Sequence, residues 1–265
     1  MKLLCVKAHP DDESLGTGGT LAKYAAEGVE TYLITATRGE HGWWGEAADY
    51  PGPIGLGQIR EAELRAAAEV LHLREVHFLD YIDGELDRAE PHAAVAQIVT
   101  HLRRIRPDVV VTFGPDGAYG HPDHIAISQF TAAAIVCAAD PGYTIDGGSQ
   151  PQRVSKFYYR VWTQTEFDVY QAIFGEQVMT IDGVGRRPVP WQDWAITTRI
   201  DTGAYWPVVW QAVACHRSQL PGYQRLKDLL PEQHQALWGS QGFYRVFSTV
   251  NSGRAIELDL FAGLR

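Results

Sequence analysis

The fold is decided by the stretch Leu3-Leu4-Cys5-Val6-Lys7-Ala8-His9-Pro10-Asp11-Asp12-Glu13, in which an apolar run passes directly into a polar turn. A short, nearly continuous apolar run that closes at a proline is typical of a buried strand in a parallel sheet. Taken alone, the polar turn has an equally good structural reading, because Asp and Pro favour turns. The stretch therefore predicts a strand over 3–8, and the rest of the chain must decide what the turn does.

Strands and helices alternate through the first part of the chain. Strand-like runs cover 31–36, 75–79, 108–113 and 156–162, and apolar residues at helical spacing cover 16–27, 59–71, 91–105 and 121–135. This alternation is typical of βαβ units around a mostly parallel sheet. We predict an α/β fold, a Rossmann-like three-layer sandwich with a strand order near 3-2-1-4-5.

The pattern weakens from Thr163 onward. We expect a loop over 183–188, a strand over 195–200, and helices over 204–219 and 222–237. A Pro/Gly-rich segment over 140–152 resembles a linker, but a strand follows it. We therefore expect a single domain over 1–265, with a core over 1–162 and a C-terminal elaboration over 163–265.

The composition excludes several classes of protein. The 265 residues are 45% hydrophobic and 21% charged, which is typical of a globular protein. Because 23 Lys and Arg stand against 32 Asp and Glu, the net charge is -9, which argues against a nucleic-acid partner. Three scattered cysteines, Cys5, Cys137 and Cys215, indicate a reducing compartment. No apolar run is long enough for a membrane anchor or signal peptide, so we expect a cytoplasmic protein that acts on small molecules.

A second polar turn, Gly117-Ala118-Tyr119-Gly120-His121-Pro122-Asp123-His124, follows the strand over 108–113. In the predicted strand order this strand lies beside the first, so the two turns face each other across one crevice. Two imidazoles and one carboxylate, with a fourth position open to water, form hydrolytic zinc sites. The two turns hold more His and Asp than such a site requires, and only one of His121 and His124 need touch the metal.

The connection over 41–58 is unusually long and holds Trp43, Trp44 and Tyr50. Such loops often form binding walls or lids. For any single tryptophan, we expect rather that it packs the loop onto the body of the protein.

The two turns resemble the signatures of the PIG-L/LmbE-like zinc-dependent N-acetylglucosamine de-N-acetylases, which stand here at 8–13 and 121–124. Weaker similarities lie at 37–40, 60–64, 83–84 and 214–219. Members of this family act on N-acetylglucosamine conjugates, including glycosyl-inositol lipids, precursors of mycothiol and bacillithiol, and natural products. The resemblance implies an amidohydrolase with an amino-sugar substrate, and relatives often form homo-oligomers.

The resemblance also implies the roles of individual residues. It makes His9, Asp12 and His124 the zinc ligands and Asp11 the general base. Zinc would lower the pKa of bound water to about 7 and polarise the acetamide carbonyl, which fits the chemistry that a poor electrophile requires. A site of two His and one Asp also suits Fe2+, which is the second candidate metal.

The remaining matches concern the substrate. His121 would be a cationic partner oriented by Asp123, and Tyr119 would help to polarise the carbonyl. A helix N-terminus disfavours the His121 cation whereas Asp123 favours it, and the sequence leaves this balance open. Arg60 and Asp83 match positions that contact the substrate in relatives, and His216 matches a position near the site. The segments over 41–58 and 183–194 have no counterpart in the family.

Two other functions compete with this interpretation. Gly16-Thr17-Gly18-Gly19-Thr20 loosely resembles the fingerprint of a nucleotide-binding Rossmann enzyme without metal, but Leu21 replaces its third glycine and the acidic turn would repel a pyrophosphate. We expect these glycines to let the helix pack beneath the metal turn instead. A non-catalytic zinc-binding module is the other alternative, and it leaves Asp11 and His121 without a purpose. A nucleophilic hydrolase is disfavoured because the chain lacks a Gly-x-Ser-x-Gly elbow.

Overall fold

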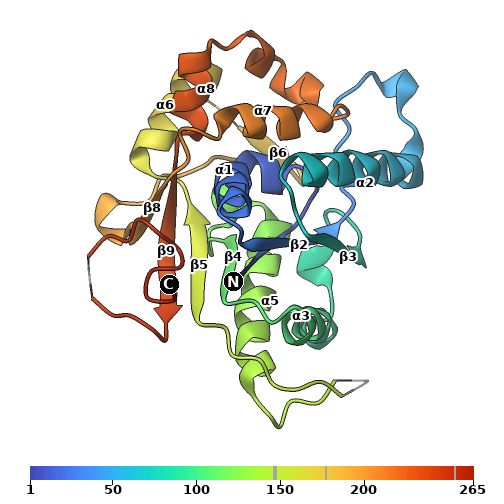
Figure 1. The fold of residues 1–265 in the computed structure, drawn as a ribbon. Helices are drawn as coiled ribbons and strands as arrows, with labels where there is room; N and C mark the ends of the chain where they lie inside the picture. Colours follow the sequence, from blue (N-terminus) through green and yellow to red (C-terminus); the bar gives the residue numbers. More distant parts are fainter. Residues whose placement is uncertain (146–147, 177, 254) are drawn as a thin grey trace.

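A seven-stranded sheet forms the middle layer of the computed structural model, which describes residues 1–145, 148–176, 178–253 and 255–265 (Figure 1). Its strand order is β3-β2-β1-β4-β5-β9-β8. The first five strands run parallel to one another, namely β1 Lys2–Lys7, β2 Glu30–Thr37, β3 Glu75–Tyr81, β4 Val109–Phe113 and β5 Lys156–Val161. The predicted α/β class and the order 3-2-1-4-5 are therefore confirmed.

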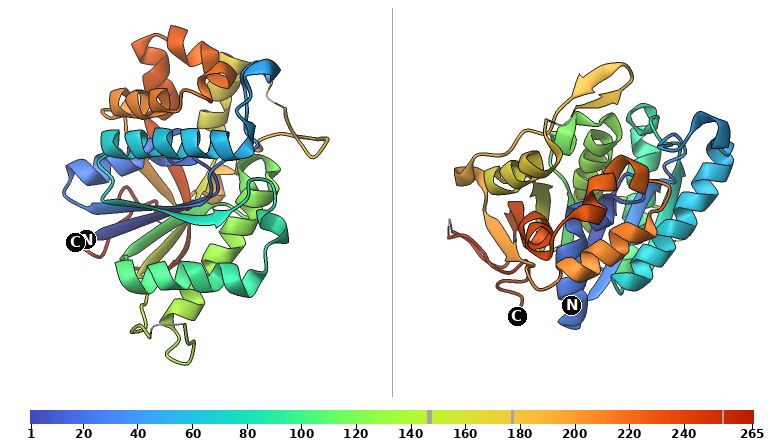
Figure 2. Two further views of the ribbon diagram at one scale, coloured as in Figure 1. Left: turned by 90° about the vertical axis from the view of Figure 1, so that its right-hand side faces the viewer. Right: turned by 90° about the horizontal axis from the view of Figure 1, so that it is seen from above.

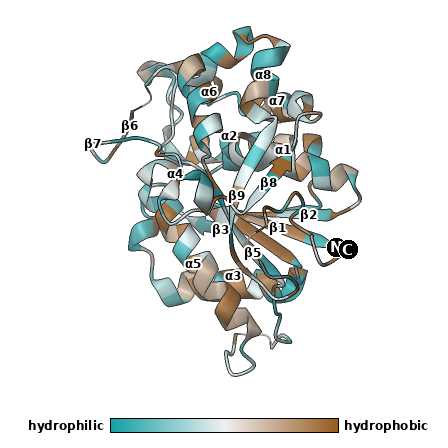
Figure 3. Ribbon diagram, turned by 90° about the vertical axis from the view of Figure 1, so that its left-hand side faces the viewer, coloured by the Kyte–Doolittle hydropathy of each residue, from teal (hydrophilic) through white to brown (hydrophobic). Residues whose placement is uncertain are grey.

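Helices cover both faces of the sheet (Figure 2). One face carries α1 Asp12–Ala26, α2 Gly52–Val70 and α7 Trp206–Cys215, and the other carries α3 Pro91–Ile105 and α5 Pro122–Ala139. Because side chains of a strand alternate between faces, Leu3 and Cys5 pack with the first set and Leu4 and Val6 with the second. Burial on both faces explains the continuous apolar run of β1, and the strands stand out as hydrophobic in Figure 3.

The C-terminal region completes the sheet. Strand β9 Ser240–Ser248 pairs antiparallel with β5, and β8 Thr198–Asp201 pairs antiparallel with β9. The strand predicted over 195–200 thus begins later, after the 3-10 turn η3 Asp193–Ala195. Strand β9 was not predicted, because Gly242 and Arg245 interrupt its apolar pattern. Two strands from the region after 163 therefore belong to the same sheet as the core.

Two further predictions were wrong. The expected loop over 183–188 is part of a hairpin of β6 Met179–Ile181 and β7 Val184–Arg186. Asp182 and Gly183 turn it with φ values of 53° and 74°, as a two-residue hairpin turn requires. The helix expected over 222–237 is divided into the 3-10 segment η4 Leu220–Asp228 and α8 Pro231–Trp238, because a proline starts a helix more readily than it continues one.

The other elements are short or lie at the periphery. They are η1 Ala47–Asp49, η2 Leu86–Arg88, α4 Gly117–Gly120 and α6 Gln164–Phe174. Helices α6, α7 and α8 share a small hydrophobic cluster above α1, as the upper part of Figure 1 shows.

The glycines of α1 contact this C-terminal region. A Cβ on Gly19 would lie 2.7 Å from the Cβ of Thr202, and one on Gly18 would lie 3.4 Å from Val209 Cγ1. The prediction that these glycines serve packing beneath the metal turn was therefore wrong for both residues. They instead let the C-terminal region approach α1.

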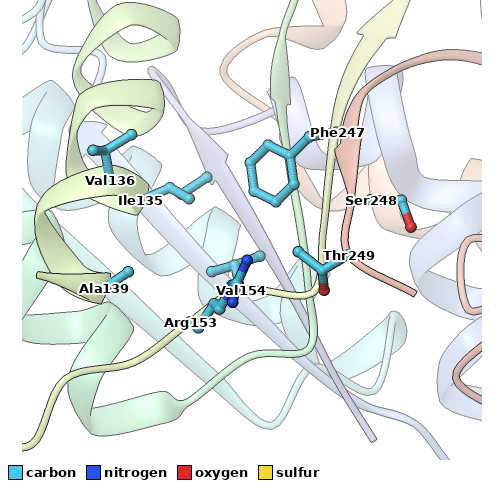
Figure 4. Close-up of a pocket in the computed structure, with 8 residues that line it drawn as sticks. All are labelled: Ile135, Val136, Ala139, Arg153, Val154, Phe247, Ser248 and Thr249. Carbon is cyan, nitrogen blue, oxygen red and sulfur yellow. The ribbon is translucent and has the colours of Figure 1, made fainter. Parts of the chain in front are cut away.

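An open hollow of about 340 Å³, drawn in Figure 4, lies where the residues before β5 meet the end of β9. Its lining comes from the end of α5, the residues before β5, and the end of β9 with the residue after it. It consists of Ile135, Val136, Ala139, Arg153, Val154, Phe247, Ser248 and Thr249. None of these lining residues is acidic or a histidine or cysteine. Among the described residues, no helix is both long enough and apolar enough to cross a membrane.

Candidate metal centre and active site

The two polar turns lie side by side because β1 and β4 are neighbours, with Leu3 paired to Val109. The rings of His9, His121 and His124 gather at this point. Their centroids are 4.7 Å apart for His9 and His121, 5.1 Å for His9 and His124, and 4.7 Å for His121 and His124. All three histidines are buried.

Three donor groups face one another within this cluster. His9 Nδ1 lies 3.2 Å from His124 Nε2. The Asp12 carboxylate lies against both rings, with Oδ2 3.6 Å from His9 Nδ1 and Oδ1 3.4 Å from His124 Nε2. In a tetrahedral zinc site with bonds of about 2.0–2.1 Å, donor atoms lie about 3.3 Å from one another. The spacing of these three groups therefore fits a metal ion.

The far nitrogens of both rings face acceptors. His9 Nε2 lies 3.0 Å from Asp83 Oδ1 and 3.1 Å from Asp123 Oδ2, and His124 Nδ1 lies 3.2 Å from the carbonyl oxygen of Gly117. A proton on each far nitrogen leaves a lone pair on His9 Nδ1 and another on His124 Nε2, pointing at each other. A cation between them satisfies both lone pairs, and metal-bound histidines are usually held in this way.

Two other donor groupings share His9. The ligand atoms of His9, His121 and His124 lie within 4.8 Å of one another, and so do those of His9, Asp83 and Asp123. The cluster as a whole is a possible His/Asp metal site. In the second grouping the carboxylates surround His9 Nε2 rather than Nδ1, so they suit the support of a ligand better than a separate ion.

Asp123 contacts groups outside its own turn through its carboxylate. Its carboxylate accepts from the backbone N–H groups of Gly84 (2.7 Å) and Leu86 (3.1 Å) and lies against His9. Its contact with His121 is through the backbone, since its own N–H donates to His121 Nδ1 at 3.1 Å. The partner of the carboxylate comes from the other turn, which sequence spacing does not show, and the orientation of His121 by Asp123 stays a prediction. Asp123 is a supporting residue for His9.

The surroundings of His121 favour the neutral form of its ring. Burial, reinforced by the neighbouring His9, lowers the pKa of His121 to about 4, although Asp123 opposes the shift. This shift disfavours the cationic partner that the resemblance implies, and the role of His121 stays a prediction. Because Nδ1 accepts from Asp123, the proton of the neutral ring resides on Nε2, where it can be donated.

Tyr119 closes this side of the cluster. Its ring meets those of His121 and His124 edge-on, with centroids 5.9 Å and 5.3 Å away. Burial, together with the nearby Asp12 and Asp11, raises the pKa of Tyr119 well above its usual value, so the phenol keeps its proton. The preceding Ala118 has a φ of 64°, a strained conformation of the kind found at functional turns.

Asp11 has the environment of a base. Its φ is 97°, in the left-handed region, and its side chain is 14% exposed. Burial raises the pKa of Asp11 to about 7, although the nearby guanidinium of Arg60 lowers it. Arg60 Nη2 lies 3.5 Å from Asp11 Oδ2, and its remaining contacts are with the carbonyl oxygens of Gly39 and Pro10.

Asp83 is buried beside the cluster. Besides its contact with His9, its Oδ2 accepts from the backbone N–H of His41, and its own N–H donates to Glu40 Oε2 at 3.2 Å. Burial alone would raise the pKa of Asp83, but the attraction between its carboxylate and His9 is stronger, so the pKa is lowered. The structure therefore places Arg60 and Asp83 against site residues, and their contacts with a substrate remain predictions.

Sequence reasoning missed the pair of Glu13 and His216. The two side chains are fully or almost fully buried, and His216 Nε2 lies 2.8 Å from Glu13 Oε1. Burial disfavours the charged forms of both side chains, but the attraction between the two opposite charges is stronger. The pKa of Glu13 is therefore lowered and that of His216 is raised. Glu13 stood in the quoted motif, but its partner is 203 positions away and no local signal indicates it.

The segment over 41–58 is attached to the C-terminal region. Gln219 Nε2 donates to the carbonyl oxygen of Gly42 at 2.8 Å, and a Cβ on Gly222 would lie 2.9 Å from the Trp44 ring. Trp44 remains 47% exposed. The packing interpretation of this tryptophan is thus supported by its contact with Gly222, and half of its surface stays open to solvent.

Comparisons with known proteins agree with the fold and the motifs. The model of the PIG-L family, described as GlcNAc-PI de-N-acetylase, matches residues 4–135. A 1D-myo-inositol 2-acetamido-2-deoxy-alpha-D-glucopyranoside deacetylase of Kineococcus radiotolerans is 34% identical, over 99% of this chain and 83% of its own. The deacetylase of the same name from Thermobispora bispora is 33% identical, over 99% of this chain and 98% of its own.

A solved structure extends the likeness to three dimensions. The conserved protein TT1542 from Thermus thermophilus superposes with a TM-score of 0.67 at 26% identity, covering 94% of this chain and 96% of its own. The similarity therefore spans the core and the C-terminal region alike. The chain belongs to the PIG-L family and is an amidohydrolase of the deacetylase type.

Proposed function

We propose that this enzyme removes the N-acetyl group from an N-acetylglucosamine conjugate in a metal-dependent reaction. The observation that carries the proposal is the set of three facing donor groups, His9, Asp12 and His124, with Asp11 at the mouth of the same turn. The names of the relatives make 1D-myo-inositol 2-acetamido-2-deoxy-alpha-D-glucopyranoside the first substrate to test.

Two imidazoles and a carboxylate suit both zinc and Fe2+. Zinc is the first candidate because this donor set, with one position left open, is that of hydrolytic zinc sites. When bound, such a metal lowers the pKa of a water molecule and polarises the acetamide carbonyl. His9 and His124 would hold it through Nδ1 and Nε2 respectively. Asp83, Asp123 and the carbonyl of Gly117 would fix the ring orientations.

Asp11 accepts the proton of the attacking water in this proposal. A base works best when its pKa lies near the working pH, and burial places the pKa of Asp11 at about 7. Arg60 holds the carboxylate in place from the side and prevents it from turning away.

His121 and Tyr119 act on the opposite side of the acetamide. The neutral His121 ring offers Nε2–H and Tyr119 offers its hydroxyl, and both donors suit an oxygen that gains negative charge as the tetrahedral intermediate forms. Asp11, once protonated, can return its proton to the departing amine.

The test is release of acetate from N-acetylglucosaminyl-inositol and from simple N-acetylglucosaminides, with metal content measured on the same samples. We expect release that a chelator abolishes and zinc or iron restores. Asp11→Asn should keep one metal per chain and lose about 10²–10⁴ in kcat, the usual range for acid–base groups.

Two results would contradict the proposal. Release that persists in the chelated, metal-free protein would remove the metal from the reaction. An Asp11→Asn protein with undiminished kcat would remove Asp11 as the base, and the acid–base role would pass to His121.

A further inference from the structure

The carboxylate of Glu13 links the metal turn to the C-terminal region by hydrogen bonds. Its Oε2 accepts from the backbone N–H of Asp11 at 3.0 Å, and its Oε1 accepts from His216 Nε2 at 2.8 Å and from the Ser14 hydroxyl. One carboxylate thus joins the backbone of Asp11 to a residue at the end of α7. The side chain of Glu13 has no exposed surface and that of His216 is 2% exposed.

The backbone of Asp11 needs such support. A φ of 97° is unfavourable for a residue with a Cβ, and it persists only where the surroundings hold it. The Asp11 N–H donates within the turn to Glu13, and its carbonyl accepts from Leu15 N–H at 2.9 Å. Loss of the first bond would release the peptide group between Pro10 and Asp11.

The far end of the pair is itself fixed. His216 follows directly after α7, and its N–H donates to the carbonyl of Val213 at 3.1 Å. Helix α7 packs against α1, which Glu13 helps to begin. The C-terminal region therefore braces the turn that carries Asp11.

We propose that Glu13, held by His216, is a positioning residue that fixes Asp11 in its left-handed conformation and so aims its carboxylate at the reaction. This inference rests on the proposed function of Asp11. It assigns to the C-terminal region a role in the reaction in addition to completing the sheet. Since an error of about 1 Å in placing a reacting group can cost 10²-fold in rate, loss of Glu13 should lower kcat far more than it changes KM.

The experiment is a double-mutant cycle of Glu13→Ala and Asp11→Asn, measured as kcat and KM for the best acetylated substrate of the wild-type holoenzyme. We expect Glu13→Ala to lower kcat by about 10- to 100-fold with KM within about twofold and one metal per chain retained. In the Asp11→Asn protein the same change should alter the residual rate by less than about twofold, because Glu13 acts through Asp11. Glu13→Gln, which keeps an oxygen acceptor for the Asp11 N–H, should recover most of the lost kcat.

A matched control separates positioning from mere stability. Glu257 is a second buried carboxylate, 2.7 Å from Lys156 Nζ and remote from the two turns. Glu257→Gln should lower the melting temperature and leave kcat unchanged well below that temperature. Should Glu13→Ala fail to fold, His216→Phe takes its place in the cycle, because it removes the donor to Glu13 while keeping a ring.

The outcomes are distinct. Losses that multiply in the Glu13→Ala, Asp11→Asn double variant, or an unchanged kcat in Glu13→Ala, overturn the inference. A wild-type protein without deacetylase activity sinks the proposed function instead, since the cycle then has no rate to measure.

Discussion

The two turns at the centre of the site are held very differently from the segments that surround them. We call residues 41–58 and 178–194 the rim. In the turns, Asp123 accepts two backbone hydrogen bonds and contacts His9, and His9, Asp123 and His124 are all buried. In the rim, Trp194 is 86% and Ile54 78% exposed, and the hairpin of β6 and β7 projects from the body (Figure 2).

This difference separates two tasks. The reacting groups must be placed closely and are fixed by hydrogen bonds between segments far apart in the chain. The rim is also joined to distant segments, for example by the hydrogen bonds of His41 with Asp83 and of Gly42 with Gln219, but its exposed side chains can change without disturbing the centre. We expect substitutions in the turns to act on metal binding and kcat, and substitutions in the rim to act on KM.

The largest effect should follow from loss of a metal donor. His124→Ala removes Nε2, which faces His9 Nδ1 and Asp12, and should lower both bound metal and activity to the level of the chelated protein. Metal content by elemental analysis and acetate release measure the two quantities. His72→Ala is the control, because His72 lies at the end of α2 outside both turns and should change neither. Full metal occupancy in His124→Ala would contradict the proposed ligand set.

A smaller effect is expected from a change in Asp123, which contacts the proposed metal donor His9. Asp123→Asn removes the charge beside His9 Nε2 and leaves an oxygen acceptor for only one of the two N–H groups of Gly84 and Leu86, which donate to different carboxylate oxygens. Loss of such a partner typically costs about 10–100-fold in metal affinity, which competition with a chelator can measure. Asp80→Asn is a suitable control, because that carboxylate is 72% exposed and pairs with Arg38. Unchanged affinity in Asp123→Asn would mean that Asp123 serves only to tie the backbone after β3.

The parallel core and the meeting of the two turns could be predicted from the sequence because both depend on local patterns. Buried strands are continuous apolar runs, and neighbouring parallel strands end at the same edge of a sheet. The motif therefore identified His9, Asp11, Asp12, His121 and His124 as members of one cluster.

The sequence did not show which side chains tertiary packing brings together. The Asp123 carboxylate supports His9 rather than His121, and Glu13 pairs with His216 across the whole chain. The lowered pKa of His121 depends on burial and on His9, neither of which a motif records. Strand β9 was missed for a related reason, since its pattern makes sense only once β5 is beside it.

The smallest effect should come from the rim and tests its separate task. Arg186 lies in β7, and its Nη1 would be 3.6 Å from a Cβ on Gly120, the residue before His121. Its buried Nε has no hydrogen-bond partner among the described residues. We expect an arginine in this position to donate, through its terminal nitrogens, to an oxygen of the substrate beyond the acetamide. Arg186→Gln should therefore raise KM by about three- to tenfold and leave kcat and metal content unchanged.

The neighbouring Arg187 supplies the matched control. Its Nε pairs with Glu176 at 2.9 Å, and both side chains are more than half exposed, so Arg187→Gln removes the same charge from the hairpin without touching Gly120. Equal changes in KM for the two variants would show that the hairpin acts only through its overall charge. A loss of kcat in Arg186→Gln, with KM unchanged, would break the division between turns and rim, because a rim residue would then be acting on the reaction itself.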